Sequence, residues 1–114
     1  YILSIDGTLK KIPKEGGIAL GVIEGLEQAN TLLSEKSLQL EKGDSLILFT
    51  DGLTESVNQN NDLYPVFRLE NILKTNAKTD LPTLINDVKN DLNDFTEGTP
   101  PFDDVTVLCL RWKK

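Results

Sequence analysis

Two apolar runs of strand length most constrain the fold of this chain of 114 residues. One covers Ser45–Thr50 and the other Val105–Leu110, and neither contains a charged residue. Short continuous apolar runs are typical of buried strands, because helices with the same burial are usually longer. We expect the first run to be a central strand buried on both faces, and the second to be another buried strand. Asp51 directly follows the first run, and Asp103 and Asp104 directly precede the second.

Turn signals predict further β-structure in the first 44 residues. Extended sequence on both sides of Asp6-Gly7 predicts a β-hairpin, because these residue types favour tight turns. The glycine-rich segment Gly16–Val22 is typical of a loop, and it lacks the Gly-Lys-Ser/Thr of a phosphate-binding loop. Partial alternation in Thr31–Leu40 predicts a strand, and Lys42–Asp44 is typical of a turn.

Two helices are predicted between the apolar runs. Apolar spacing after Pro65 indicates a first helix, which follows a polar loop at Asn58–Asp62. Leu81–Phe95 is strongly amphipathic, with Asp80 as its expected N-cap and Gly98 beyond its end. We expect the Asp, Asn and Lys side chains of this second helix to face water. A hairpin, further strands and two helices indicate an α+β domain.

The composition excludes several classes of protein. The chain has 12 Lys and Arg against 18 Asp and Glu, a net charge of −6, which argues against binding to nucleic acid or to an anionic membrane. It has no His, which excludes mechanisms that use an imidazole base, and its single Cys109 cannot form an intrachain disulfide. No apolar run approaches the roughly 20 residues that span a bilayer. Because the chain lacks Met and starts within strand-like sequence, we expect it to be part of a longer protein.

The acidic residues at the ends of the two apolar runs are candidate metal ligands. If the two strands are antiparallel neighbours, Asp51 and Asp103 lie at the same edge of the sheet. If the strands are parallel, these residues are about 20 Å apart. The connection contains two helices, so it permits either direction. Carboxylates without His or Cys suit Mg²⁺ or Mn²⁺, which prefer oxygen ligands. The alternative is that Asp-Gly and Asp-Asp form only a turn and a loop.

Motifs at these positions match a known family. Leu40–Ser56 reads Leu-Glu-Lys-Gly-Asp-Ser-Leu-Ile-Leu-Phe-Thr-Asp-Gly-Leu-Thr-Glu-Ser, and Asp103–Thr106 reads Asp-Asp-Val-Thr. Ala19–Val22 adds an Ala-Leu-Gly-Val step. Together they resemble the PPM-type metal-dependent serine/threonine protein phosphatases, in the bacterial branch typified by SpoIIE and RsbU. The resemblance covers nearly the whole chain and implies an antiparallel β-sandwich flanked by helices.

The resemblance also implies a metal-dependent mechanism. Asp51 and Asp103 would each bind a metal of a dinuclear Mn²⁺ or Mg²⁺ centre, and Asp104 would support Asp103 or replace it as the ligand. Thr50, Gly52 and Glu55 of the same motif would support the geometry. The two cations would activate a bridging water and neutralise the phosphoryl oxygens while the water attacks phosphorus in line.

The chain departs from the family pattern in two places. Tyr64-Pro65 stands where the family usually has Phe-Gly, so this loop is expected to differ in shape. The family's earlier Asp-x-x-Gly-His-Gly-type element, which supplies the Asp shared by both metals, is absent. We therefore expect residues 1–114 to be the C-terminal part of a single phosphatase domain, inactive when isolated.

The expected function is hydrolysis of phosphoserine or phosphothreonine on a regulatory protein of the anti-sigma antagonist type. Relatives in this branch imply a cytoplasmic enzyme behind an upstream sensor domain. The main alternative is a non-catalytic interaction or assembly module derived from the same fold, which self-associates through exposed strand edges. A small Mg²⁺- or Ca²⁺-binding domain is a weaker alternative, because no loop has ligands at alternating positions.

Overall fold

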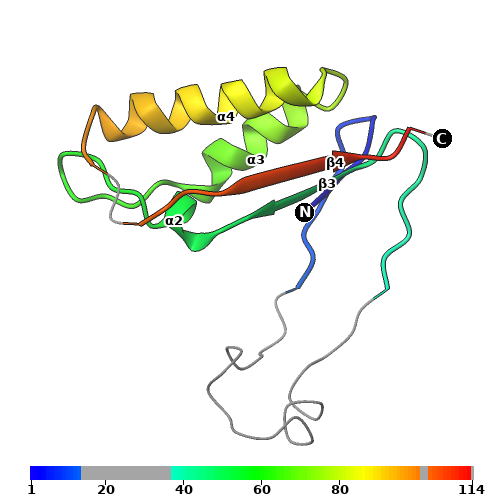
Figure 1. Cartoon of the computed structure of the whole chain (residues 1–114), viewed down its shortest axis with the longest axis horizontal. Coiled ribbons are helices and arrows are strands. Elements are labelled where there is room, and N and C mark those ends of the chain that lie inside the picture. The colour runs from blue at the N-terminus through cyan, green and yellow to red at the C-terminus, as the bar shows by residue number, and fades with distance from the viewer. Residues whose placement is uncertain (14–36, 101–102, 114) are drawn as a thin grey trace, which may run out of the picture.

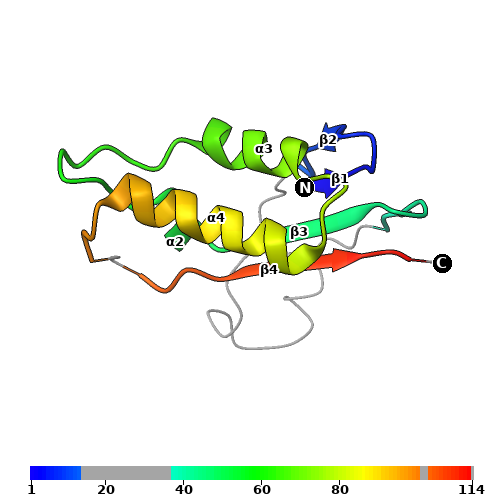
Figure 2. The same cartoon turned by 90° about the horizontal axis from the view of Figure 1, so that it is seen from above.

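A computed structural model describes residues 1–13, 37–100 and 103–113, and Figure 1 shows their arrangement. Four strands form one sheet, and helices cover one face of it (Figures 1 and 2). The fold class is therefore α+β, as predicted. In chain order the elements are β1 (Ile2–Leu3), β2 (Leu9–Lys10), β3 (Ser45–Phe49), α2 (Asp51–Thr54), α3 (Val66–Thr75), α4 (Leu81–Thr96) and β4 (Val107–Arg111).

The sheet has the strand order β2-β1-β3-β4, and every neighbouring pair is antiparallel. β3 pairs with β4 from Ser45↔Arg111 to Phe49↔Val107. The predicted hairpin is confirmed, with Gly7 at a φ of +91° in the turn between β1 and β2. The end of β3 and the start of β4 therefore lie side by side, which decides between the two directions that the sequence left open.

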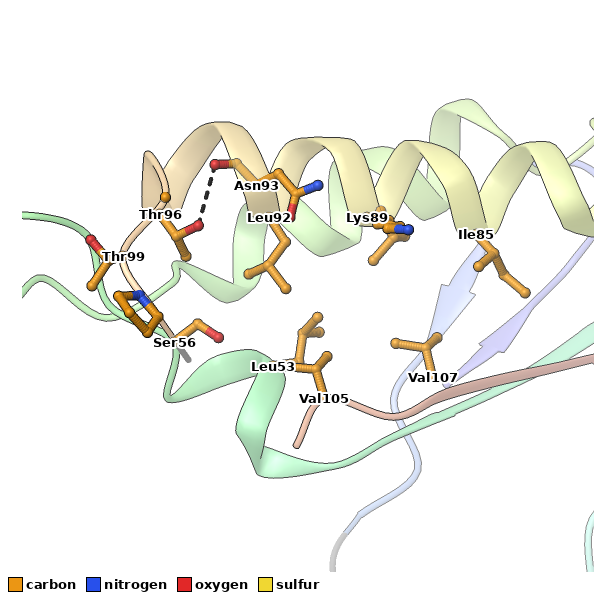
Figure 3. Close-up of a pocket in the computed structure, with 13 residues that line it drawn as sticks. Leu53, Ser56, Ile85, Lys89, Leu92, Asn93, Thr96, Thr99, Val105 and Val107 are labelled. Carbon is orange, nitrogen blue, oxygen red and sulfur yellow. Dashed lines mark hydrogen bonds between the residues drawn. The ribbon is translucent and has the colours of Figure 1, made fainter. Parts of the chain in front are cut away.

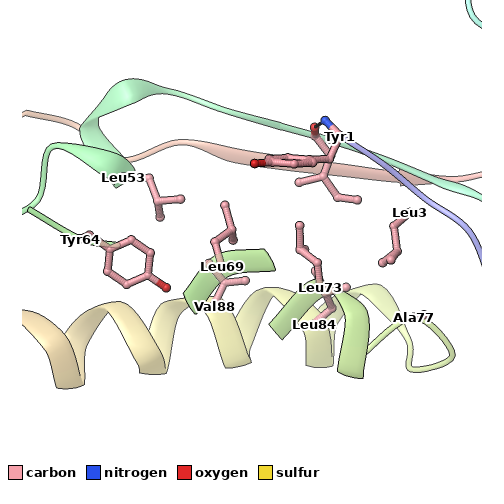
Figure 4. Close-up of a cluster of buried hydrophobic side chains, with 10 residues drawn as sticks. Tyr1, Leu3, Leu53, Tyr64, Leu69, Leu73, Ala77, Leu84 and Val88 are labelled. Atoms are coloured by element: carbon pink, nitrogen blue, oxygen red, sulfur yellow. Dashed lines mark hydrogen bonds between the residues drawn. The ribbon is translucent and has the colours of Figure 1, made fainter. Parts of the chain in front are cut away.

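The core lies between the sheet and the two long helices (Figure 4). Leu69 and Leu73 of α3 and Leu84 and Val88 of α4 point toward the sheet and are buried. Their spacing is the one from which both helices were predicted. Strand residues on the facing side complete the core, among them Leu3 and Ile47.

The limits of α4 follow from local chemistry. Asp80 is the N-cap, as predicted: its Oδ1 accepts a hydrogen bond from Thr83 N at 3.0 Å, and its Oδ2 accepts one from Thr83 Oγ1 at 2.8 Å. These bonds to the charged form lower the pKa of Asp80. Glu97 and Gly98 adopt positive φ angles of 47° and 79° and end the helix.

The opposite face of the sheet is open within the described residues, so the prediction that Ser45–Thr50 is buried on both faces was wrong. Leu48 pairs with Leu108, and Leu46 pairs with Leu110. Leu48, Leu108 and Leu110 keep 48%, 58% and 51% of their surface exposed. A run that is apolar on both faces has the same sequence pattern whether other elements cover its second face or not, so the pattern alone could not predict this exposure. The last strand also starts later than predicted, at Val107 instead of Val105.

The prediction that all polar side chains of α4 face water was wrong for Asp91. Its Oδ2 accepts hydrogen bonds from Tyr64 Oη at 2.6 Å and Arg68 Nε at 3.0 Å, and its Oδ1 accepts one from Arg68 Nη2 at 2.7 Å. Phe95 packs edge-on against the Tyr64 ring and lies beneath the Arg68 guanidinium. These contacts join α4 to α3 through Arg68, and to the loop before α3 through Tyr64, which belongs to the Tyr64-Pro65 pair that replaces the expected Phe-Gly.

Asp91→Asn is expected to flatten the acid dependence of stability. Hydrogen bonds from Arg68, and then from Tyr64, hold the pKa of Asp91 below its ordinary value. The unfolded carboxyl titrates near a pKa of about 3.9. The stabilisation is therefore present above that pH and is lost as pH falls through the lower folded pKa. At pH 7 the substitution should cost about 1–2 kcal/mol in urea unfolding, and this cost should shrink as the pH is lowered.

The matched control is Asp94→Asn, an exposed carboxylate on the same helix. This variant should keep the acid dependence of the unsubstituted chain. An Asp91→Asn chain that loses stability with falling pH as steeply as the Asp94→Asn chain would contradict the pairing.

Some predictions lie wholly or partly outside the described residues. The loop Gly16–Val22 and the Ala19–Val22 step are outside them, as are positions 31–36 of the predicted strand Thr31–Leu40. Residues 37–40 are described and are not part of a strand. The predicted turn at Lys42–Asp44 is present, with Asp44 N donating to Glu41 O at 3.0 Å. No helix among the described residues is both long and apolar enough to cross a membrane.

Candidate functional site

The chain changes from strand to helix at Thr50. β3 ends at Phe49, and the four-residue helix α2 starts at Asp51. Thr50 has extended backbone angles, and its carbonyl accepts a hydrogen bond from Leu53 N at 3.2 Å. No helix was predicted at this position from the sequence. The side chain of Leu53 is fully buried in the core, and this burial fixes α2 against the sheet.

The Thr50 hydroxyl links this change of direction to the start of the last strand. Oγ1 donates to the carbonyl of Asp104 at 3.2 Å and accepts from Thr106 N at 3.0 Å. The Thr50 backbone amide also donates to Thr106 O at 3.0 Å. Three hydrogen bonds of one threonine therefore join the segment before Asp51 to the segment that follows Asp103.

Gly52 lets the two segments approach closely. A Cβ atom at this position would lie 2.5 Å from the carbonyl oxygen of Asp104 and 3.1 Å from its carbonyl carbon. Because such contacts with backbone atoms are too short for any side chain, glycine is the residue that fits. The Gly52 carbonyl also accepts a hydrogen bond from the buried hydroxyl of Ser56 at 2.7 Å, which holds α2 in place from its other end.

The structure brings the backbone of every predicted site residue to this one end of the sheet. Asp51, Asp103 and Asp104 are exposed, whereas Gly52 is buried. Asp103 Oδ1 accepts a hydrogen bond from Asp104 N at 2.8 Å, which orders the loop before β4. The carboxylates belong to two segments that are distant in sequence and are held together by Thr50 and Gly52.

The donor set suits a hard divalent cation, because carboxylate oxygens are the ligands that Mg²⁺ and Mn²⁺ prefer. Within residues 1–13, 37–100 and 103–113, no group of three or more Asp, Glu or Cys side chains is placed to hold a metal ion. Among the described residues, Asp51 and Asp103 could therefore supply only part of the ligands of such a site.

A pocket of about 620 Å³ lies beside α2, between α4 and the segment that leads into β4 (Figure 3). Leu53 and Val105 form part of its apolar wall, together with Val88 and Leu92 from α4. Lys89 is the charged residue of the described lining. Because α2 carries both Asp51 and Leu53, the pocket borders the candidate site.

Sequence reasoning assigned no role to Arg111, which joins the far ends of several elements. Its Nε donates to Ser45 Oγ at 2.8 Å and its Nη2 donates to Ala77 O at 3.1 Å, while Nη1 donates to Thr79 O. The turn between α3 and α4 is thereby fastened to the sheet. No local pattern signals these bonds, because the partners are more than 30 residues apart in sequence.

The antiparallel sheet with helices on one face matches the fold of a PP2C domain. The SiaA-PP2C domain of Pseudomonas aeruginosa has a similar structure, with a TM-score of 0.61 and 23% sequence identity. The match covers 67% of this chain and 31% of that chain, and at this identity it supports the fold alone.

The sequence profile of the family described as stage II sporulation protein E (SpoIIE) matches residues 1–113. The chain therefore belongs to the SpoIIE family. Protein IcfG of Synechocystis sp. (strain ATCC 27184 / PCC 6803 / Kazusa) is 29% identical over 112 residues. That alignment covers 96% of this chain and 16% of IcfG, so the chain spans about a sixth of the length of this relative.

Proposed function

We propose that residues 1–114 form the C-terminal part of a single SpoIIE-like domain that hydrolyses phosphoserine or phosphothreonine on a regulatory protein. One observation carries the proposal: Thr50 and Gly52 hold the segments of Asp51 and Asp103 together at one end of the sheet. Exposed carboxylates from two chain segments could supply some of the ligands of a metal-dependent site. Membership of the family favours a regulatory substrate of the anti-sigma antagonist type and an upstream sensor domain in the longer chain.

Asp51 and Asp103 would hold the metal ions, with Asp104 next to them. When bound, a pair of Mn²⁺ or Mg²⁺ ions supplies an activated water and neutralises charge on the phosphoryl group. The chain itself contributes placement. Leu53 anchors α2 in the core, so that Asp51 stays at the end of the sheet, and Thr50 keeps the Asp103 segment beside it. An Asp shared by both metals is expected from the part of the domain that precedes Tyr1.

The test compares phosphate release by the isolated 114-residue chain and by a longer chain that includes the preceding part of the domain. The longer chain should hydrolyse a phosphoserine peptide or an aryl phosphate only with Mn²⁺ or Mg²⁺. The isolated chain should be inactive and bind metal weakly, because two carboxylates leave most of the coordination to water. Full metal-dependent activity of the isolated chain would contradict the division of the site between two parts of the domain.

The second candidate function is a non-catalytic assembly module, and the open face of the sheet favours it. Leu48 and Leu108 are cross-strand partners on this face, Leu110 is the next residue of β4 on the same face, and all three are about half exposed. Contiguous exposed apolar surface marks an interaction site. A folded longer chain that is inert with either metal but forms a stable complex through this face would support assembly over catalysis.

A further inference from the structure

The hydroxyl of Thr50 accepts a hydrogen bond that the carbonyl of Thr50 would accept in a regular sheet. In a regular antiparallel ladder, the carbonyl of Thr50 would accept from the amide of Thr106. That carbonyl instead accepts from Leu53 in α2, and Thr106 N donates to the Thr50 hydroxyl at 3.0 Å. The side chain thus extends the β3–β4 pairing by one residue while the backbone already turns into the helix.

The same hydroxyl reaches the residue next to the candidate ligand. Its proton is donated to the carbonyl of Asp104 at 3.2 Å, and the Asp104 carbonyl also lies where a Cβ on Gly52 would clash. The Asp104 peptide is therefore held between Thr50 and Gly52. This contact fixes the loop that carries Asp103 relative to the first residue of α2, which is Asp51.

We propose that Thr50 is a positioning residue, whose hydroxyl sets the separation between Asp51 and Asp103 and thereby the affinity of the site for divalent metal. This inference rests on the function proposed above for the same site. Both hydrogen bonds of the hydroxyl are solvent-exposed and so contribute little to folding. Metal binding depends much more steeply on ligand placement, because a productive site tolerates displacements of only about 0.5 Å.

The test is a titration of the longer chain with Mn²⁺ alone, followed by the electron paramagnetic resonance signal of the free ion. Thr50→Val keeps the shape of the side chain and removes both hydrogen bonds. It should raise the dissociation constant for Mn²⁺ at least tenfold while the melting temperature shifts little. Thr50→Ser keeps the hydroxyl and should stay within twofold of the unsubstituted chain.

Thr75→Val is the matched control. The Thr75 hydroxyl is placed to donate to the carbonyl of Asn71 at 2.9 Å or of Ile72 at 3.1 Å, at the exposed end of α3. Loss of this hydroxyl should leave the Mn²⁺ titration unchanged, since both of its hydrogen bonds lie within α3 and involve neither acidic segment.

Three results would overturn the inference: unchanged Mn²⁺ affinity in Thr50→Val, equal impairment in Thr50→Ser, or a Thr50→Val chain that does not fold. The last result would show that the threonine serves the fold and not the placement of ligands. Asp51→Asn separates this inference from the proposed function. If the unsubstituted chain binds Mn²⁺ and Asp51→Asn does not, an unchanged Thr50→Val overturns only the role of Thr50. If the unsubstituted chain binds no Mn²⁺, both proposals fail.

Discussion

Asp51→Asn in the longer chain is expected to lower Mn²⁺-dependent phosphate release by about 10³-fold or more, equivalent to ~4 kcal/mol of transition-state stabilisation. The amide has nearly the same shape as the carboxylate but lacks its negative charge, so a hard cation is held poorly. Asp51 is exposed on a helix whose position is fixed by the buried Leu53. The substitution should therefore leave the fold intact, which circular dichroism can verify.

Asp6→Asn is the matched control for charge. Asp6 is an exposed turn residue of the β1–β2 hairpin, and its Oδ1 accepts a hydrogen bond from Thr8 N at 2.8 Å. An amide oxygen can accept the same bond, and Asn suits this turn as well as Asp does. Phosphate release by this variant should match the unsubstituted chain. Equal activities in the Asp51→Asn and Asp6→Asn chains would refute the assignment of Asp51 as a metal ligand.

The elements that sequence predicted well are those fixed by local signals. Examples are the period of apolar residues in α4, the Asp80 cap and the turn at Gly7. Each of these depends on residues that are close together in the sequence. The expected burial of β3 on both faces failed because it depends on what covers the second face. Leu48 has the same sequence character whether that face is open or covered, and only the tertiary structure reveals its exposure.

The location of the candidate site could be predicted from the sequence, but the contacts that hold its two segments together could not. Because Asp51 follows one strand and Asp103 precedes another, we expected both residues at one edge of the sheet if the strands are antiparallel. β3 and β4 are antiparallel, so the backbones of the two residues do lie at the same edge. The contacts of Thr50 and Gly52 with Asp104 span more than 50 residues, so no periodicity or turn preference could reveal them. The pairing of Asp91 with Arg68 was missed for the same reason.

Val88→Asp is expected to destabilise the fold by about 3–5 kcal/mol, because it places an unpaired charge in the interface between α4 and the sheet. Val88 keeps only 2% of its surface exposed and belongs to the buried cluster that also contains Leu53 and Leu84 (Figure 4). The side chains of this cluster are apolar apart from the Tyr hydroxyls, so the new carboxylate would lie against apolar surface. Urea unfolding followed by circular dichroism measures the loss.

Asn90→Asp on the same helix separates this effect from a general effect of added negative charge. Asn90 is exposed, two residues after Val88, so its substitution should change the free energy of unfolding by less than about 0.5 kcal/mol. Coincident unfolding curves for Val88→Asp and Asn90→Asp would show that the buried face of α4 is assigned incorrectly. A large loss for Val88→Asp alone would also carry a consequence for the site, since Val88 belongs to the same buried cluster as Leu53, and Leu53 holds the helix that begins at Asp51.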